Sequence, residues 1–266
     1  QLVEEGELSD HINESVMAIM LSHVNFRTGA LLDMLDLTKR AHHAGALAIW
    51  DLAHSAGALE VELDACHVDF AVGCTYKYLN AGPGAPAFVY CNQAIVQQVT
   101  QPLSGWMGHA FAFEFDSNYT PDAGIKKFLC GTPPIVSMAC VEAALSAFDG
   151  VSMHAIRAKS IALSETFEAL LRDHGLLQLL TPVHSADPHT RGSQLAYASD
   201  HAYGLCQSLI ERGVVPDFRA PNYIRFGFTP LYTSFDDVWK AVEHIVQAIE
   251  NEEHMHPRWR EKLAVT

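Results

Sequence analysis

The feature that most constrains this chain is a pair of short apolar runs, each as long as a buried strand and each followed by polar groups. Residues 46–50 lead to Asp51, and residues 68–73 lead to Thr75, Tyr76 and Lys77. A third such run, 16–21, comes earlier, and residues 33–44 between them carry apolar side chains at helical spacing. Strand, helix, strand in this order predicts parallel pairing with a right-handed crossover. The sequence therefore predicts an α/β fold with a mostly parallel sheet.

The polar groups at the two strand ends predict a cofactor site. In open α/β sheets, ligands bind at the carboxyl ends of the strands. A lysine and a carboxylate there suit pyridoxal phosphate: Lys77 forms the Schiff base and Asp51 pairs with the pyridinium nitrogen. Taken singly, Asp51 is equally typical of a turn cap and Lys77 of a solvated surface residue. The Gly-Pro-Gly turn at 82–84 and the next strand, 87–91, favour the site because they hold Lys77 in a tight connection.

Composition excludes several other classes of function. A net charge of −14 argues against a nucleic-acid partner, and no apolar run is long enough to suggest a membrane partner. The six cysteines form no CxxC pair, and no signal peptide is recognised, so we expect a cytoplasmic protein. The fifteen histidines show no HExxH or Cys/His pattern, so no metal site is expected.

The rest of the chain predicts two domains with a boundary near residue 150. Residues 101–131 form a long loop rich in Pro, Gly and aromatic residues, which is typical of functional or interface segments. Residues 1–150 are expected to be part of a large α/β domain, and 151–266 a small α+β domain. The remaining predicted elements are helices at 92–100, 132–148, 155–174, 200–212 (capped by Asp200) and 234–251 (capped by Ser234), and strands at 192–198 and 223–228.

Five segments in order along the chain carry a resemblance to one family. They are WDLAHSAG (50–57), CTYKYLNAGPG (74–84), PLSGW (102–106), CGTPPI (130–135) and RFGFTPLY (225–232). Together they resemble bacterial kynureninases. The resemblance implies an aspartate aminotransferase-like, fold-type-I pyridoxal phosphate enzyme with a large domain, a small C-terminal α+β domain and a homodimer with shared active sites. It also implies hydrolysis of a carbon–carbon bond in L-kynurenine or 3-hydroxykynurenine, giving anthranilate or 3-hydroxyanthranilate and L-alanine, in tryptophan catabolism and NAD biosynthesis.

The resemblance assigns four cofactor-binding residues near the strand ends. Lys77 is similar to the Schiff-base lysine, which also moves the proton at the substrate Cα. Asp51 is similar to the partner of the pyridinium nitrogen. Ser22 and His54 match positions that line the cofactor, although a strand-end Ser is also a common cap and a buried His often only satisfies a backbone group.

Four further residues receive roles in the same way. Tyr76 matches a phosphate-binding residue proposed to act as an acid, and a phosphate contact without a proton role stays open. Trp106 and Thr132 match phosphate contacts supplied by the other subunit, with simple packing as the alternative for Trp106. Arg225 matches the residue that binds the substrate α-carboxylate, which suits a bidentate guanidinium, with a surface ion pair as its alternative.

The resemblance begins part-way along the family. The expected phosphate loop and the aromatic residue that stacks on the cofactor are not found before Ser22, so the N-terminal portion of the large domain is expected to be missing. We therefore expect weak cofactor affinity and little turnover from this chain alone. The enzymatic alternative is a cysteine desulfurase or selenocysteine lyase, for which Cys130 lies in a loop but directly before Gly131-Thr132, where packing is expected. The alternative from another class is a catalytically silent fragment or scaffold that keeps this fold and dimerises through residues 105–108.

Overall fold

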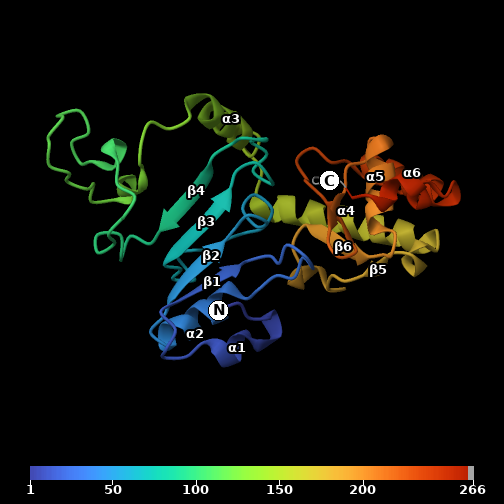
Figure 1. The fold of residues 1–266 in the computed structure, drawn as a ribbon, viewed down its shortest axis with the longest axis horizontal. Helices are drawn as coiled ribbons and strands as arrows, with labels where there is room; N and C mark the ends of the chain where they lie inside the picture. The colour runs from blue at the N-terminus through green and yellow to red at the C-terminus, as the bar shows by residue number, and fades with distance from the viewer. Residues whose placement is uncertain (263–266) are drawn as a thin grey trace. The chain divides into compact units, whose positions relative to one another are not determined.

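The computed structural model describes residues 1–262, which form two structural units (Figure 1). The first unit contains Gln1–His23, Asp33–Ala56 and Val61–Ala147, and the second contains Val24–Leu32, Gly57–Glu60 and the chain from Phe148. The end of the predicted small domain, residues 263–266, lies outside the described residues. Two domains divided at residue 150 stay a prediction.

A four-stranded sheet forms the centre of the first unit. Its order is β1-β2-β3-β4, with β1 (Ala18–Ser22), β2 (Leu47–Asp51), β3 (Phe70–Cys74) and β4 (Ala87–Cys91). β1, β2 and β3 are parallel, as predicted, and β4 is antiparallel to β3. The connection from β3 to β4 contains bends and turns but no crossover helix, so the chain returns beside β3 in the antiparallel direction.

Helix α2 (Met34–His43) connects β1 and β2 and covers one face of the sheet. Its amphipathic pattern buries Leu37 and Ala41, and the Asp33 side chain caps its first turn. The indole of Trp50, on β2, is fully buried and donates to Thr38 Oγ1 at 3.0 Å. Truncating such a side chain typically costs roughly 3–5 kcal/mol, so this contact is a major part of the unit's core. The N-terminal residues form η1 (Glu5–Glu7) and α1 (Leu8–His11).

The predicted helix at 92–100 is wrong, because the structure has only turns there. The Asn92 side chain accepts the Ala94 amide and donates to the Val68 carbonyl. The buried Lys127 ammonium then binds the carbonyls of Val96 and Val99 at 2.7 and 3.3 Å. A side chain, in place of a helical N–H, thus satisfies these carbonyls.

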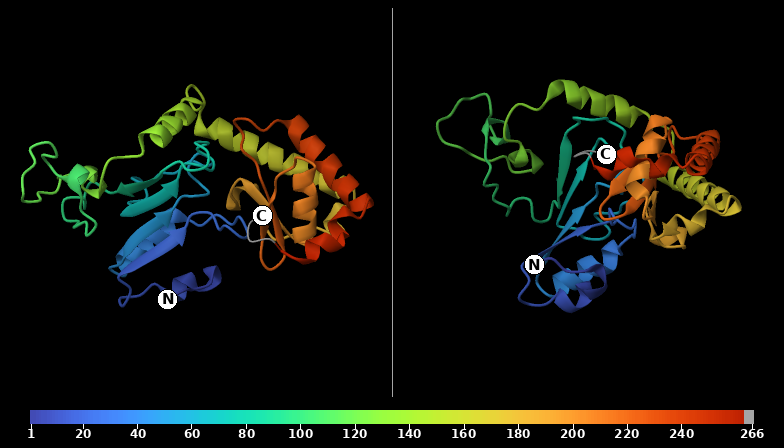
Figure 2. Two further views of the ribbon diagram at one scale, coloured as in Figure 1. Left: turned by 45° about the horizontal axis from the view of Figure 1, so that its top comes forward. Right: turned by 45° about the vertical axis from the view of Figure 1, so that its right-hand side comes forward.

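Residues 101–131 form the predicted long loop, which reaches away from the sheet (green in Figure 2). Within it lie only the short 3-10 turns η2 (Trp106–Gly108) and η3 (Ile125–Phe128). Helix α3 (Ile135–Ser146) follows and buries none of its residues, although most of them are apolar.

The second unit combines an antiparallel sheet with three helices. The sheet has the order β5-β6-β8-β7, with β5 (Thr181–Pro182), β6 (Gln194–Ala198), β8 (Tyr223–Gly227) and β7 (Asp217–Arg219). The helices are α4 (Met153–Asp173), α5 (Ala202–Glu211) and α6 (Phe235–Glu250). One core joins them, in which the Phe167 ring packs against the rings of Phe226 and Phe228 at 4.7 and 5.4 Å. Short 3-10 turns complete the unit: η4 (Leu176–Gln178), η5 (Pro188–Thr190), η6 (Glu253–Met255) and η7 (Pro257–Arg260).

The two predicted helix caps have different outcomes. Ser234 caps α6 in a capping box with Asp237, as the sequence predicts. The prediction for Asp200 is wrong: α5 begins at Ala202, its N-cap position is His201, and no side chain caps it there. The Ser199 hydroxyl instead accepts the His201 amide at 3.3 Å, so the chain makes an ordinary turn before the helix.

Candidate active site

Ser22 and Asp51 lie side by side where β1 and β2 end. The strand register pairs them directly, and the His23 amide donates to the Asp51 carbonyl at 2.9 Å just beyond. The Asp51 carboxylate accepts the Ala53 amide through Oδ1 at 2.8 Å. No hydrogen bond reaches its second oxygen from within residues 1–262. One carboxylate oxygen at this strand end is therefore available to a ligand.

The Lys77 ammonium and the His54 imidazole are in contact, with Nζ 3.1 Å from Nε2. A charged Lys77 donates in this contact, and Nε2 accepts as the unprotonated nitrogen. The same Nζ lies 5.7 Å from the centre of the Tyr76 ring, whose side chain is 49% exposed. Three residues that the sequence places in one cofactor site are thus brought together.

The backbone that carries Lys77 is held by hydrogen bonds within the connection from β3 to β4. The Thr75 hydroxyl donates to the Pro86 carbonyl at 2.6 Å, and the amide of Ala81 donates to the Thr75 carbonyl at 3.0 Å. The Asn80 amide closes a turn on the Lys77 carbonyl, with Asn80 in the left-handed conformation (φ 63°). Asn tolerates that conformation better than most residues. The lysine is therefore presented from a closed turn.

Trp106 and Thr132 lie at the two ends of the long loop in the first unit, and both side chains are exposed. The Trp106 ring packs edge-on against Phe113 at 5.8 Å. The loop ends touch, because a Cβ at Gly105 would lie 1.7 Å from the Cys130 carbonyl oxygen. The structure therefore brings the neighbourhoods of these two residues together.

Arg225 lies on β8 in the second unit and is only 8% exposed. Its Nε donates to Asp217 Oδ1 at 2.9 Å, its Nη2 lies 2.7 Å from the same oxygen, and its Nη1 donates to the Phe26 carbonyl. Sequence reasoning identified Arg225 and missed Asp217. Asp217 lies two residues before Arg219 on the strand that pairs with Arg225, a hairpin that the sequence analysis did not recognise.

His23, directly after Ser22, is a second residue that sequence reasoning missed. Its side chain is buried, and burial lowers its pKa from 6.5 to about 4. The imidazole lies edge-on to Trp50 at 5.8 Å, and Nδ1 has no hydrogen-bond partner in the described part of the chain. The imidazole is therefore neutral at physiological pH, and its position beside a candidate site residue is the signal that could have drawn attention to it.

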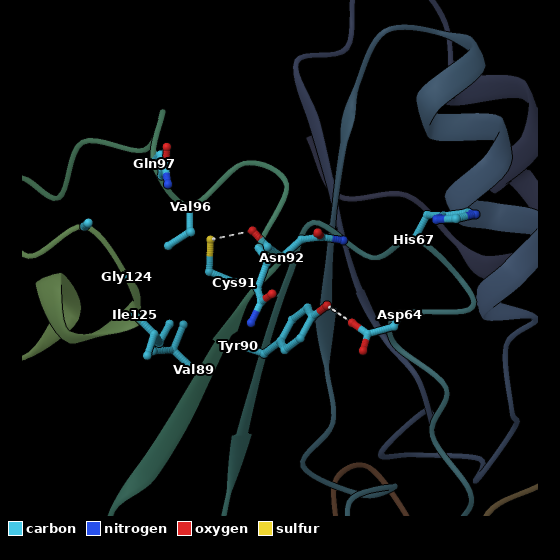
Figure 3. A pocket seen from close by; sticks show the side chains of 12 residues that line it. Asp64, His67, Val89, Tyr90, Cys91, Asn92, Val96, Gln97, Gly124 and Ile125 are labelled. Carbon is cyan, nitrogen blue, oxygen red and sulfur yellow. Dashed lines mark hydrogen bonds between the residues drawn. The ribbon is translucent and has the colours of Figure 1, made fainter.

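A cavity of about 870 Å³ lies elsewhere in the first unit (Figure 3). The edge strand β4 lines it with Tyr90 and Cys91, opposite Gly124 and Ile125. The Tyr90 hydroxyl donates to Asp64 at 2.6 Å; burial and this contact raise the pKa of Tyr90 to about 12, and burial raises the pKa of the Cys91 thiol. Both groups therefore stay protonated at neutral pH, and none of the predicted site residues lines this cavity.

Other kinds of site have little support among the described residues. All six cysteines are free, and the Cys130 thiol donates to the Leu103 carbonyl at 2.9 Å across the contact between the loop ends. Within residues 1–262, no group of three His, Cys, Asp or Glu side chains could hold a metal ion. No helix in that range is both long and apolar enough to cross a membrane.

The fold is that of known pyridoxal phosphate enzymes. The structure matches an apo cysteine desulfurase from Thermococcus onnurineus NA1 with a TM-score of 0.76, over 92% of this chain and 63% of that one, at 17% sequence identity. At this identity the match shows the fold alone, and it confirms the predicted fold-type-I class.

The sequence is most informative about the family. Residues 156–245 match the kynureninase C-terminal domain. The chain is 47% identical over 263 residues to a kynureninase from Burkholderia mallei (strain SAVP1), covering 99% of this chain and 63% of the relative. It is 44% identical over 260 residues to the kynureninase of Pseudomonas fluorescens, covering 98% of this chain and 62% of that relative. The chain spans 63% of the length of the first of these relatives, and over that part it is similar to kynureninases throughout.

Proposed function

We propose that this chain supplies the cofactor-binding and substrate-binding residues of a kynureninase. The enzyme would use pyridoxal phosphate to hydrolyse L-kynurenine, or its 3-hydroxy form, to anthranilate or 3-hydroxyanthranilate and L-alanine. The 47% identity to a curated kynureninase across 263 residues carries this proposal. The contact between Lys77 and His54, together with Asp51 at the adjoining strand end, supports it.

The residues at the strand ends fit pyridoxal phosphate. Asp51 offers one carboxylate oxygen that accepts no hydrogen bond from the described residues, and a protonated pyridine nitrogen is the donor that it suits. Lys77 offers an amine of the kind that condenses with an aldehyde, and His54 Nε2 can accept one of its protons. Ser22, opposite Asp51, would line the same end of the sheet. When bound, the cofactor supplies an electron sink for the bonds at the substrate Cα.

The chain's own side chains would then move protons and orient the substrate. Lys77 would remove and return the proton at Cα, and His54 would hold its amine in place between the two transfers. Arg225 would bind the substrate α-carboxylate through its planar fork. Tyr76, whose ring lies 5.7 Å from Lys77 Nζ, would donate either a proton to the substrate Cβ when the Cβ–Cγ bond breaks or a hydrogen bond to the cofactor phosphate.

We also propose that the protein works as a homodimer in which Trp106 and Thr132 contact the cofactor phosphate of the partner subunit. The first unit exposes large apolar side chains, including Phe113 at 75%, Phe115 at 85% and Val136 at 82%. Exposed apolar side chains of this size are common at protein–protein interfaces. We expect light scattering to report a dimer, and Val136→Glu, on a helix with no buried residue, to shift it towards monomer without unfolding.

A cytoplasmic location and a role in tryptophan catabolism that feeds NAD biosynthesis belong to the same proposal. The six free cysteines support the location, since a reducing compartment maintains thiols.

Borohydride reduction tests the cofactor site. Protein mixed with excess pyridoxal phosphate, reduced and digested, is expected to carry the pyridoxyl label on Lys77. The Lys77→Ala variant is expected to lose that label, whereas Lys126→Ala, on the loop, keeps it. A label spread over surface lysines, with none on Lys77, would contradict the proposal.

Product release tests the reaction. Turnover by this chain alone is expected to be slow, and kynurenine is expected to give fluorescent anthranilate in a Lys77-dependent manner. Sulfide released from cysteine, with no anthranilate released from kynurenine, would instead favour the cysteine desulfurase alternative. Cofactor binding without release of either product would favour a catalytically silent protein.

The Tyr76→Phe variant separates the two roles of that hydroxyl. If Tyr76 only binds phosphate, the variant weakens cofactor affinity and leaves kcat unchanged at saturating cofactor. If Tyr76 is an acid, kcat falls by about 100-fold at saturating cofactor, within the range for general acid catalysis. Tyr232→Phe, on a residue 72% exposed, is the matched control.

A further inference from the structure

Arg225 is one member of a line of three charged side chains on β7 and β8. Asp217 lies directly opposite Arg225 in the antiparallel pair, and Arg219 lies two residues further along β7. Side chains at these positions share one face of a sheet. Asp217 Oδ1 contacts Arg225, and Asp217 Oδ2 lies 2.9 Å from Arg219 Nη2. The carboxylate therefore joins two guanidinium groups, and the three groups together carry a net charge of +1.

The contacts to Arg225 involve all three nitrogens of its guanidinium. Nε and Nη2 both face Asp217 Oδ1, and Nη1 donates to the Phe26 carbonyl. That carbonyl is itself fixed, since it also accepts the Gln194 amide at 3.0 Å. A guanidinium has five N–H donors, so each terminal nitrogen keeps at least one donor beyond these contacts. Two such donors form the fork that binds a carboxylate in bidentate fashion.

Because Arg225 is buried, the orientation of its guanidinium decides which partners its donors reach. Arg225 is 8% exposed, so its guanidinium cannot satisfy its donors with water, and a buried charge needs partners. Asp217 supplies the partner, but its negative charge alone would cancel that of Arg225 and weaken attraction for an anion. Arg219, whose side chain is 42% exposed, restores the positive charge.

We propose that Asp217 is the positioning residue for Arg225 and that Arg219 compensates its charge, so that the guanidinium keeps a fixed plane and a positive charge for binding the substrate carboxylate. This inference rests on the proposed function, in which Arg225 binds that carboxylate. Asp217 itself touches no substrate. Its role is to fix the guanidinium plane before substrate arrives, which lowers the ordering cost of binding.

Substrate affinity in the cofactor-loaded protein tests the proposal. Asp217→Ala is expected to raise KM for kynurenine about tenfold and to change kcat less than twofold. Asp217→Asn keeps an oxygen that can accept from Nε, so it is expected to restore KM to within about threefold of the wild type. Arg219→Gln, which leaves the Arg225–Asp217 pair with no net positive charge, is expected to raise KM about threefold. Circular dichroism of each variant reports whether the unit is folded.

A ligand without the carboxylate separates positioning from a structural role. Kynuramine, the decarboxylated form of kynurenine, is expected to bind the wild type and Asp217→Ala with equal affinity, measured from the change in cofactor absorbance. Equal KM values for kynurenine in wild type and Asp217→Ala would overturn the inference, as would tighter kynurenine binding by Asp217→Ala.

The Arg225→Gln variant distinguishes failure of this inference from failure of the proposed function. If Arg225→Gln raises KM and Asp217→Ala does not, only the inference fails. If Arg225→Gln leaves KM unchanged, the role of Arg225 fails and the inference falls with it. If the wild type releases no anthranilate and binds no kynurenine, the proposed function and the inference are both overturned.

Discussion

Protonation of His23 should destabilise the protein as the pH falls below neutrality. His23 is 7% exposed, and burial lowers its pKa from 6.5 to about 4. Between these two values the unfolded chain binds a proton that the folded chain does not, so stability rises with pH there and is lost as the pH falls. Each unit of pKa difference corresponds to 1.36 kcal/mol, so the full loss is about 3 kcal/mol below pH 4. About 2 kcal/mol of it falls between pH 7 and pH 5.

Urea denaturation at pH 7 and pH 5 measures this effect. His23→Phe keeps a planar ring that can meet Trp50 edge-on, and it removes the titrating group and the Nδ1 that has no partner among the described residues. We expect the wild type to lose about 2 kcal/mol more than His23→Phe on going from pH 7 to pH 5. The exposed His43 provides the matched control, and His43→Gln should follow the wild type.

Parallel loss of stability in wild type and His23→Phe would refute this reasoning. It would mean that the imidazole finds a proton acceptor or solvent when it is charged, so that burial does not disfavour its cation. A loss of stability confined to His43→Gln would refute it equally.

Three structural predictions test the units separately. Asp69 accepts hydrogen bonds from the buried Ala48 amide at 2.7 Å and from His42 Nε2 at 2.8 Å. Asp69→Ala should lower the free energy of unfolding by about 3 kcal/mol in urea denaturation, and Asp69→Asn should lower it by about half of that. Removal of the α6 capping box by Ser234→Ala should cost about 1 kcal/mol in the same assay, and an unchanged midpoint would contradict the cap. Gly105→Ala forces apart the ends of the long loop, so limited proteolysis there should be faster; Gly131→Ala, with open space at its Cβ, should behave as wild type.

Local patterns predicted the elements that bear the chemistry. Short apolar runs ending in polar residues located β1, β2 and β3, and the helical spacing before Gly45 located α2. These predictions succeeded because parallel strands of α/β sheets are typically near-continuous apolar runs, although β1 exposes Met20 and β2 exposes Leu47 in this structure. The position of Lys77 in a closed turn also follows from local sequence, since Gly and Pro after Asn80 leave few alternatives.

Interactions between distant residues were harder to predict. The apolar spacing at 92–100 is compatible with a helix, but the carbonyls there bind Lys127, 31 residues beyond Val96. Asp217 and Arg219 were missed because a three-residue strand leaves almost no periodic signal, and only pairing with β8 reveals their role. The Asp200 prediction failed because Asp is a favourable N-cap residue, but the sequence does not locate the first residue of a helix to a single position.

The two structural units are each made of segments that are separate in the sequence. The segments Val24–Leu32 and Gly57–Glu60, which follow the ends of β1 and β2, belong to the second unit. Hydrogen bonds from Gln194 and Arg225 to the Phe26 carbonyl hold the first of these segments, four residues after Ser22 in the chain. The segment that contains Phe26 therefore follows Ser22 closely in the chain, and its Phe26 carbonyl binds Arg225. Substitutions at Gln194 should consequently change the position of the Arg225 guanidinium, because both side chains donate to the Phe26 carbonyl.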